Sequence, residues 1–214
     1  MVRIDSEYFD IICYEYDDGF PKTFECDDYI APVISLLNKR GYYTKNCCEG
    51  HVSPSYYNTE RSEYLRIDKV YITYGIYYSG AYIMMDDKVT NIPVEDFPFN
   101  EWRIEINDIY QNSNSGDILL GRDKIDITSK EEYRKIYKKL NKKGMKHIII
   151  IRQKGGKINE YIKSISDRDA NYEDMYRIIH MRNKDIEKLY KWAKELKENL
   201  LFKRMKEFTW KIIK

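Results

Sequence analysis

The residues with the greatest potential for chemistry in this chain are consecutive. Cys47 and Cys48 are followed directly by Glu49, Gly50 and His51. Thiols, carboxylates and imidazoles serve as metal ligands, as nucleophiles with their bases, and as hydrogen-bonding groups for bound molecules. Glycine adopts backbone conformations closed to other residues, so Gly50 predicts a tight turn. This stretch is the first candidate for a functional site.

Two interpretations of the stretch are catalytic or metal-binding. In a metal site Cys47, Cys48 and His51 would be ligands, and Cys13 or Cys26 would supply a fourth. Neighbours on a strand point to opposite faces, so only one of the adjacent cysteines can share a site with the histidine. In a nucleophilic site Cys48 and His51 would form a thiolate–imidazole pair, but no third group is evident to orient the ring. We therefore predict no catalytic residue, no metal and no cofactor.

A structural interpretation treats the cysteines as small apolar residues and Gly50 as a turn residue only. The interpretation that we favour is a binding turn whose backbone N–H groups hold an anion such as a phosphate. Cationic side chains and the imidazole would add donors, tyrosines would stack on a base, and a carboxylate would accept a ribose hydroxyl. The predicted ligand-binding residues are Lys45, Cys48, Glu49, Gly50, His51, Tyr78, Tyr82, Arg103 and Arg122.

A helix followed by a strand must position this turn. Asp27 and Asp28 offer an N-cap for a helix, and apolar residues recur at helical spacing from Ile30 to Leu37. Gly41 is expected to end the helix in the left-handed conformation. A strand then leads directly into the turn.

The other predicted elements give an α+β fold. Strands are predicted over 8–16, 68–74, 81–85, 101–106 and 146–152, polar loops over 52–67 and 108–117, and a helix from Ser129 to Gly144 with Glu132 completing a capping box. The nearly apolar strands 81–85 and 146–152 belong in the interior of a sheet. The first helix–strand unit aligns with the second at an offset of 103 residues, so we predict a mixed sheet carrying two such units.

The C-terminal part of the chain is predicted to be helical. Apolar residues at helical spacing indicate a long amphipathic helix over roughly 182–213, which needs a surface for its apolar face. That surface would be the body of the protein or a second copy of the chain in a homo-oligomer. We predict an α+β ligand-binding domain over 1–155 and a helical region over 156–214.

The charge is divided between the two parts of the chain. Residues 130–214 hold 25 basic and 12 acidic residues, a net charge of +13, whereas 1–129 hold 12 and 23, a net charge of −11. We favour two halves that attract each other over a basic half that binds an anionic partner. The basic half has no Gly-aromatic or zinc-finger motif, which argues against nucleic acid as the partner.

The sequence also predicts the compartment. No stretch approaches the ~20 apolar residues of a membrane span, and the N-terminus has no apolar signal-peptide core. We expect a cytoplasmic protein with free thiols and no contact with a membrane.

The segment from the helix end at 38–41, through the turn Cys48-Glu49-Gly50-His51, to the strand start at 80–83 resembles a known group. It looks like uncharacterised small proteins of Firmicutes and their phages that carry a Cys-x-Gly-His turn after such a helix. It is similar, more remotely, to wybutosine-synthesis tRNA methyltransferases, whose turn reads Ser-Cys-Ser-Gly-Arg. Glu49 and His51 stand where that family has serine and arginine. The resemblance covers about residues 28–85.

Three functions follow as expectations. The phage-type resemblance implies a protein that binds and sequesters a small nucleotide-like ligand, such as a host defence signal. The alternative is a nucleotide- or RNA-modifying enzyme, a transferase or phosphoesterase, that uses His51 or Glu49. A third class is an interaction protein whose C-terminal helix binds a host partner.

Overall fold

The computed structural model describes residues 2–4, 24–55, 75–86, 89, 91–111, 118–143, 147–168 and 170–199, with the backbone alone at 2–4, 24–25, 53–55, 108–111, 118–123 and 141–143. The strands are β1 (Val2–Ile4), β2 (Phe24–Cys26), β3 (Thr44–Cys48), β4 (Val52–Ser55), β5 (Gly75–Tyr78), β6 (Tyr82–Met85), β7 (Trp102–Gln111), β8 (Ile118–Ile127) and β9 (His147–Gln153). The helices are α2 (Ala31–Lys39), α3 (Lys130–Lys143), α4 (Gly156–Ser164) and α5 (Tyr172–Glu195). The strands predicted at 8–16 and 68–74, Cys13, and the predicted helix beyond 199 lie outside the described residues.

Five strands form the main sheet, in the order β3-β6-β9-β7-β8. Strands β6 and β9 lie in its interior, as their apolar sequences predicted, and the α+β class is confirmed. Every pairing in this sheet is antiparallel, so the predicted mixed sheet is wrong. The reason is that α3 carries the chain past β7, and β9 therefore pairs with β7 instead of with the preceding strand β8.

The longest strands were predicted least well. The segment 108–111 continues β7, and β8 pairs with it along its length, so the start of the predicted loop at 108–117 is wrong. Another part of a predicted loop, 52–55, forms β4, which pairs with β5 in a separate two-stranded ribbon. These strands can contain many polar residues, because hydrogen bonds to the partner strand satisfy the backbone groups whatever the side chains are.

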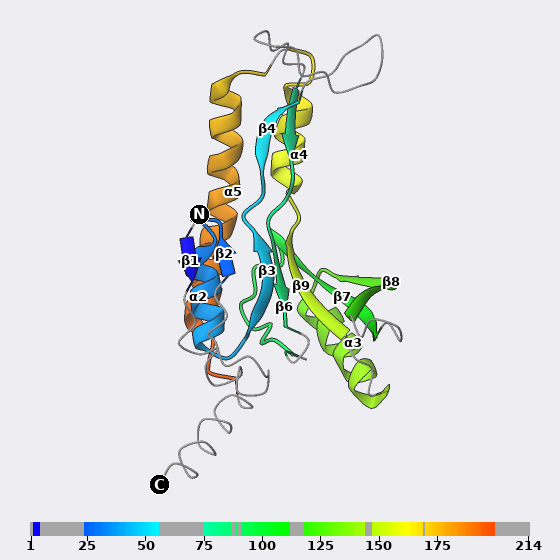
Figure 1. Cartoon of the computed structure of the whole chain (residues 1–214). Helices are drawn as coiled ribbons and strands as arrows, with labels where there is room; N and C mark the ends of the chain where they lie inside the picture. Colours follow the sequence, from blue (N-terminus) through cyan, green and yellow to red (C-terminus); the bar gives the residue numbers. More distant parts are fainter. Residues whose placement is uncertain are drawn as a thin grey trace.

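Helices α2, α3 and α5 bury their apolar faces on one face of the sheet, the core face. Figure 1 shows α2 beside the C-terminal half of α5. Two predicted helix ends are confirmed. Gly41 follows the C-terminus of α2 with a φ of +78°, and Ser129 precedes the N-terminus of α3, where its hydroxyl accepts a hydrogen bond from the Glu132 N–H. The long helix differs from its predicted range of 182–213. A capping box between Asn171 and Asp174 starts it ten residues earlier, and it ends at Glu195.

A second, smaller apolar cluster lies beside β4 and β5. It joins Ile76 of the ribbon to Ile158 of α4, to the C-cap residue Ile165 and to Ile178 of α5. Figure 1 shows these elements extending beyond the main sheet along the N-terminal half of α5. The turn after β3 connects the two parts, because β3 belongs to the main sheet and β4 to the ribbon.

Ion pairs link the basic C-terminal part of the chain to the acidic N-terminal part. The pairs that cross between them are Lys130–Glu95, Arg134–Glu95, Arg152–Glu105, Arg182–Glu49 and Lys188–Glu101. This is the arrangement expected of two halves that attract each other.

Among the described residues, the structure has no helix with the length and apolar character required to cross a lipid bilayer.

Candidate functional site

The two adjacent cysteines of β3 point to opposite faces of the sheet. Cys47 pairs with Ile83 and Cys48 with Tyr82 across the β3–β6 ladder. The Cys47 sulfur lies 3.2 Å from the Cys26 sulfur on the core face, where the hydrogen bond between the two thiols, together with burial, raises the pKa of Cys26 above its usual value. Cys48 lies on the other side, which we call the open face. Only Cys48 can therefore act together with the turn.

The turn depends on Gly50. Its φ is +85°, a conformation that other residues adopt only with strain. A Cβ atom at this position would lie 2.4 Å from the backbone oxygen of Ser79. The next residue, His51, is fixed from both sides, because its N–H donates to the Ser79 hydroxyl (2.9 Å) and its carbonyl accepts from the Ser79 N–H (3.0 Å).

Helix α5 anchors the turn through a buried arginine. Arg182 donates to the Gly50 carbonyl (2.7 Å) and lies 3.0 Å from Oε1 of Glu49. The other carboxylate oxygen of Glu49 accepts the Tyr29 N–H at 3.0 Å. Each oxygen of Glu49 thus has a partner within the protein, and these contacts position the turn.

The N–H groups of the turn are all engaged. Glu49 donates to Oδ2 of Asp27 (3.0 Å), Gly50 donates to the Cys48 sulfur (3.3 Å), and His51 donates to Ser79. The predicted anion-binding turn is wrong for this reason: no turn N–H remains for a phosphate. The surroundings are also acidic, since two carboxylates lie beside the sulfur.

Asp27 is the site residue that sequence reasoning missed. It was predicted to cap the helix, but the N-cap residue of α2 is Ile30, without a side-chain cap. The backbone carbonyl of Asp27 accepts the Ala31 N–H, which leaves the carboxylate to reach across to Glu49. Asp27 and Glu49 are 22 residues apart in the sequence, and no local sequence pattern predicts their contact.

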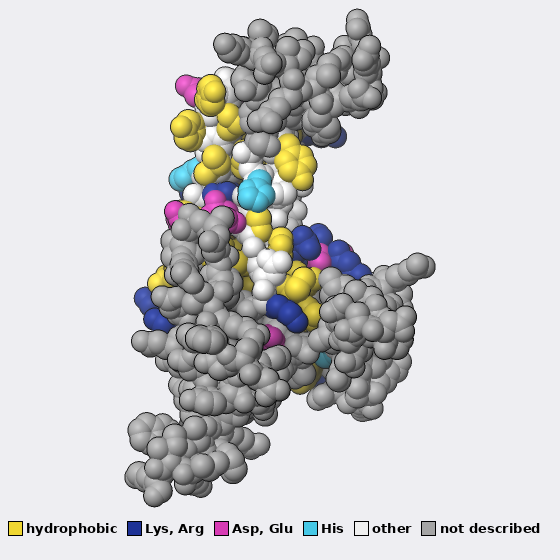
Figure 2. All heavy atoms as spheres, in the orientation of Figure 1, with side chains coloured by type: hydrophobic (Ala, Val, Ile, Leu, Met, Phe, Trp, Pro, Cys, Tyr) yellow, Lys and Arg dark blue, Asp and Glu magenta, His cyan; other side chains and the backbone are white. Residues whose placement is uncertain are grey.

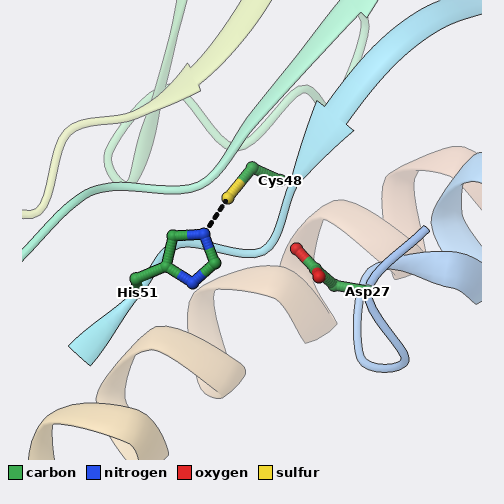
Figure 3. A group of neighbouring side chains, drawn as sticks. All are labelled: Asp27, Cys48 and His51. Atoms are coloured by element: carbon green, nitrogen blue, oxygen red, sulfur yellow. Dashed lines mark hydrogen bonds between the residues drawn. The ribbon is translucent and has the colours of Figure 1, made fainter. Parts of the chain in front are cut away.

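Asp27, Cys48 and His51 converge on one point (Figure 3). One ligand atom from each of the three side chains lies within 4.8 Å of the other two. The Cys48 sulfur and Nε2 of His51 are 3.3 Å apart. The carboxylate and the sulfur are half-buried, whereas the imidazole is exposed.

The neighbours of Cys48 do not activate it as a nucleophile. Burial raises the pKa of the thiol above its usual value, and the carboxylates of Asp27 and Glu49 raise it further. The hydrogen bond from the Gly50 N–H lowers the pKa but does not outweigh these effects. A reactive cysteine needs a depressed pKa, so this arrangement does not favour covalent catalysis.

A row of functional side chains crosses the open face from this turn. Cys48, Tyr82, Arg152 and Arg103 are paired in sequence across β3, β6, β9 and β7. Paired residues on neighbouring strands point to the same face. The register therefore places a thiol, a phenol ring and two guanidinium groups in one line, at intervals of about 4.8 Å.

The arginine end of the row is a cationic cluster built on Glu105. This carboxylate is only 1% exposed, and its Oε1 receives Lys124 (2.9 Å), Arg152 (2.9 Å) and Arg103 (2.8 Å). Burial alone would raise the pKa of Glu105, but the three ion pairs outweigh it, and the net shift is downward. The three cations remain 28–41% exposed. We call these three cations the cationic cluster.

Tyr82 lies between the turn and the cationic cluster. The guanidinium carbon of Arg152 is 5.3 Å from the centre of its ring. Figure 2 shows Lys and Arg side chains gathered over the β9–β7–β8 part of the sheet, and a histidine with acidic side chains on the other side of the same view. The open face therefore has an acidic end at the turn and a basic end at the cluster.

The remaining predicted residues lie apart from this row. Lys45 is exposed at a bulge of β3, about 10 Å along the strand from Cys48. The Tyr78 hydroxyl donates to Gln153, and its ring faces Gly155, so this tyrosine is held within the protein. Arg122 lies in β8, and the structure describes only its backbone.

Comparisons with protein-family models, with curated proteins and with solved structures find no match to this chain.

Proposed function

We propose that the protein binds a small phosphorylated, nucleotide-like ligand on the open face of the five-stranded sheet. The observation that carries this proposal is the cationic cluster, in which three partly exposed cations share a single oxygen of a buried glutamate. Arginine has five N–H donors and lysine has three, so one carboxylate oxygen uses only part of their capacity. The remaining donors are available to an anion from solvent.

Glu105 prepares the cluster for such an anion. Its ion pairs restrict the rotamers of Arg103, Lys124 and Arg152, and a ligand then loses less side-chain entropy on binding. Asp126 also lies near the cluster, 3.3 Å from Lys124 and 3.7 Å from Arg103. Three cations against two carboxylates leave a net charge of +1, which favours a ligand that brings additional negative charge.

Tyr82 supports the nucleotide-like character of the ligand. Its ring lies next to Arg152 in the cross-sheet row. An aromatic ring beside a guanidinium group offers a surface on which a planar base can stack. Two strand spacings, about 10 Å, separate Tyr82 from Arg103 along the row. A base near Tyr82 and a phosphate near the arginines would therefore be bound together.

A binding measurement tests the proposal. Purified protein is titrated calorimetrically with mononucleotides, cyclic nucleotides, dinucleotides and ADP-ribose, with the unphosphorylated nucleosides as references. We expect a phosphorylated compound to bind and its nucleoside to bind much more weakly. Arg152→Gln should weaken binding about 10–100-fold, the value of one charge-assisted hydrogen bond. Arg134→Gln is the matched control, because Arg134 pairs with Glu95 away from the row.

Two results would contradict the proposal. One is that no phosphorylated compound binds more tightly than its nucleoside. The other is that Arg152→Gln and Arg134→Gln bind the compound equally well while both variants stay folded.

A second candidate function, a phosphoesterase or transferase, is favoured by one observation. The Cys48–His51 contact lies at the Cys48 end of the cross-sheet row, next to Tyr82, so an imidazole is near one end of a ligand placed along the row. Chromatography of the ligand after incubation separates the two functions. An unchanged ligand indicates sequestration, and a converted ligand whose turnover His51→Ala abolishes indicates an enzyme.

A further inference from the structure

The turn after β3 differs chemically from the cationic cluster and suits a ligand of the opposite charge. Its N–H groups are consumed within the protein, and the atoms that it presents are a carboxylate oxygen, a sulfur and an imidazole nitrogen. From these residues we infer that Asp27, Cys48 and His51 form a binding site for a divalent transition metal, with Zn²⁺ as the best fit. This inference does not depend on the ligand proposed above.

The distances between the donor atoms fit a metal. Zinc binds sulfur at about 2.3 Å and nitrogen or oxygen at about 2.0–2.2 Å, which places ligand atoms of a tetrahedral site about 3.3–3.7 Å apart. The separation of 3.3 Å between the Cys48 sulfur and Nε2 of His51 already lies in this range. The carboxylate oxygen of Asp27, within 4.8 Å of both atoms, needs only a small side-chain rotation to complete the triangle.

The surrounding structure orients each donor. The Glu49 N–H fixes the Asp27 carboxylate at 3.0 Å, and the Gly50 N–H points at the Cys48 sulfur at 3.3 Å. The backbone of His51 is held on both sides by Ser79. Contacts of this kind around the ligands hold the donors of metal sites in place.

The types of donor select the metal. A thiolate with an imidazole favours zinc and related transition metals, whereas magnesium and calcium prefer sites made of oxygen alone. Arg182 of α5, which anchors the turn, pairs with Glu49 and the Gly50 carbonyl. Three protein ligands, one of them the exposed His51, leave a coordination position for water or a small ligand.

The adjacent residues of β3 provide a matched control for the site. Cys47 and Cys48 differ by one position, but Cys47 contacts Cys26 on the core face and cannot reach the turn. No metal was predicted from the sequence, and the metal site considered there used both cysteines, His51 and a third cysteine. The structure instead brings one cysteine and an aspartate to His51.

Metal titration tests the inference without any nucleotide. Metal-stripped protein is titrated with Zn²⁺ against a chelator of known affinity, and Co²⁺ is used as a spectroscopic probe of thiolate ligation. We expect one site per chain and a sulfur-to-cobalt charge-transfer band. Cys48→Ser, His51→Ala and Asp27→Asn should each lower Zn²⁺ affinity at least about 100-fold, more than the loss of an outer contact costs.

Two control variants keep the test decisive. Cys47→Ser should keep the affinity and the charge-transfer band, and His180→Ala, which changes an exposed histidine on α5, should do the same. Circular dichroism and thermal unfolding confirm that each variant is folded. The inference is overturned if the protein binds no Zn²⁺, if the three ligand variants bind it as well as the unmodified chain, or if the cobalt band is lost with Cys47 and kept without Cys48.

Discussion

The core face and the open face of the five-stranded sheet are built from alternate residues of the same strands. On the core face Ile83, Ile104 and Ile151 lie in one cross-sheet row and are fully buried. On the open face the next row runs through Tyr82 and Arg152, and the cluster beside it is built on Glu105. The core face has the residues that folding requires. The open face also buries Ile148 and Ile150, but there Glu105 and its three cations bring charges into the middle of the sheet.

The difference has an energetic meaning. Apolar residues of similar volume often replace a buried ion pair without loss of stability. Glu105 stabilises the fold while its three cations are present, but stability alone poorly explains why the whole charged cluster exists around a residue that is 1% exposed. An explanation through ligand binding accounts for both the buried carboxylate and the cations that remain partly exposed.

The largest effect is expected on the core face. Ile151→Ala removes a fully buried side chain and should lower the free energy of unfolding by about 2–5 kcal/mol. Its neighbour on the open face, Arg152→Gln, should lower the free energy of unfolding by less, about 1–2 kcal/mol, because Arg152 is partly exposed and two other cations still pair with Glu105. Urea unfolding measures both. Equal losses would mean that the two faces do not differ as described.

The next largest effect on the free energy of unfolding is expected at the turn after β3. Gly50→Ala forces a side chain into a conformation with φ of +85° and against the backbone oxygen of Ser79. The strain should cost about 1–3 kcal/mol and should also weaken Zn²⁺ binding, since His51 would move. Gly75→Ala is the control, because no atom lies within 4 Å of an added Cβ atom there. A Gly50→Ala protein as stable as the unmodified chain would contradict this role of the turn.

The cationic cluster predicts a dependence of stability on pH. The pKa of Glu105 is lower in the folded protein than its ordinary value of 4.5, so acid protonates the unfolded chain first. The stability from Glu105 should be complete above about pH 4.5 and should be lost as the pH falls through the lower folded pKa. Glu105→Gln should cost about 1–3 kcal/mol at neutral pH and lose less stability on acidification.

Unfolding measured from about pH 7 to about pH 3 checks this prediction across the window set by the ordinary carboxyl pKa. Glu131→Gln, which changes an exposed glutamate in the first turn of α3, should leave the acid response unchanged. The same pH profile for Glu105→Gln and the unmodified chain would show that the three ion pairs do not form in solution.

The smallest changes in the free energy of unfolding are expected for substitutions of the two adjacent cysteines, and the two changes should differ. Cys47→Ser places a hydroxyl next to Cys26 and should cost about 1–2 kcal/mol, because a half-buried polar group loses solvation there. Cys48→Ser should change the free energy of unfolding by less than about 0.5 kcal/mol. Thermal unfolding in the absence of metal gives both values. A reversed order would place Cys48, not Cys47, against the core.

Local sequence signals were sufficient for part of this structure. Gly41 ended its helix as predicted, and Gly50 formed the turn, because each conformation depends on one residue. The apolar runs 81–85 and 146–152 predicted interior strands. The rule that neighbours on a strand face opposite ways correctly separated Cys47 from Cys48.

The candidate site could not be assembled from the sequence, because it depends on strand register. Arg152 meets Glu105 only because β9 pairs with β7 in one particular alignment, and Lys124 reaches it from β8, a strand that was not predicted. Asp27 accepts the N–H of Glu49 in the turn, although the two residues are 22 positions apart in the sequence. Alternating charged residues at 103–105 and 124–126 were the one available sign that these strands have a polar face.

A structure of the complex shows whether the open face binds the ligand. The protein should be crystallised with the phosphorylated compound that binds most tightly. We predict density for the phosphate within hydrogen-bonding distance of Arg152 and Arg103, with the rest of the ligand toward Tyr82. A separate pocket of about 610 Å³ lies between residues 93–98 and the C-terminal end of α5, lined in part by Trp192. Density in that pocket and none on the open face would contradict the account.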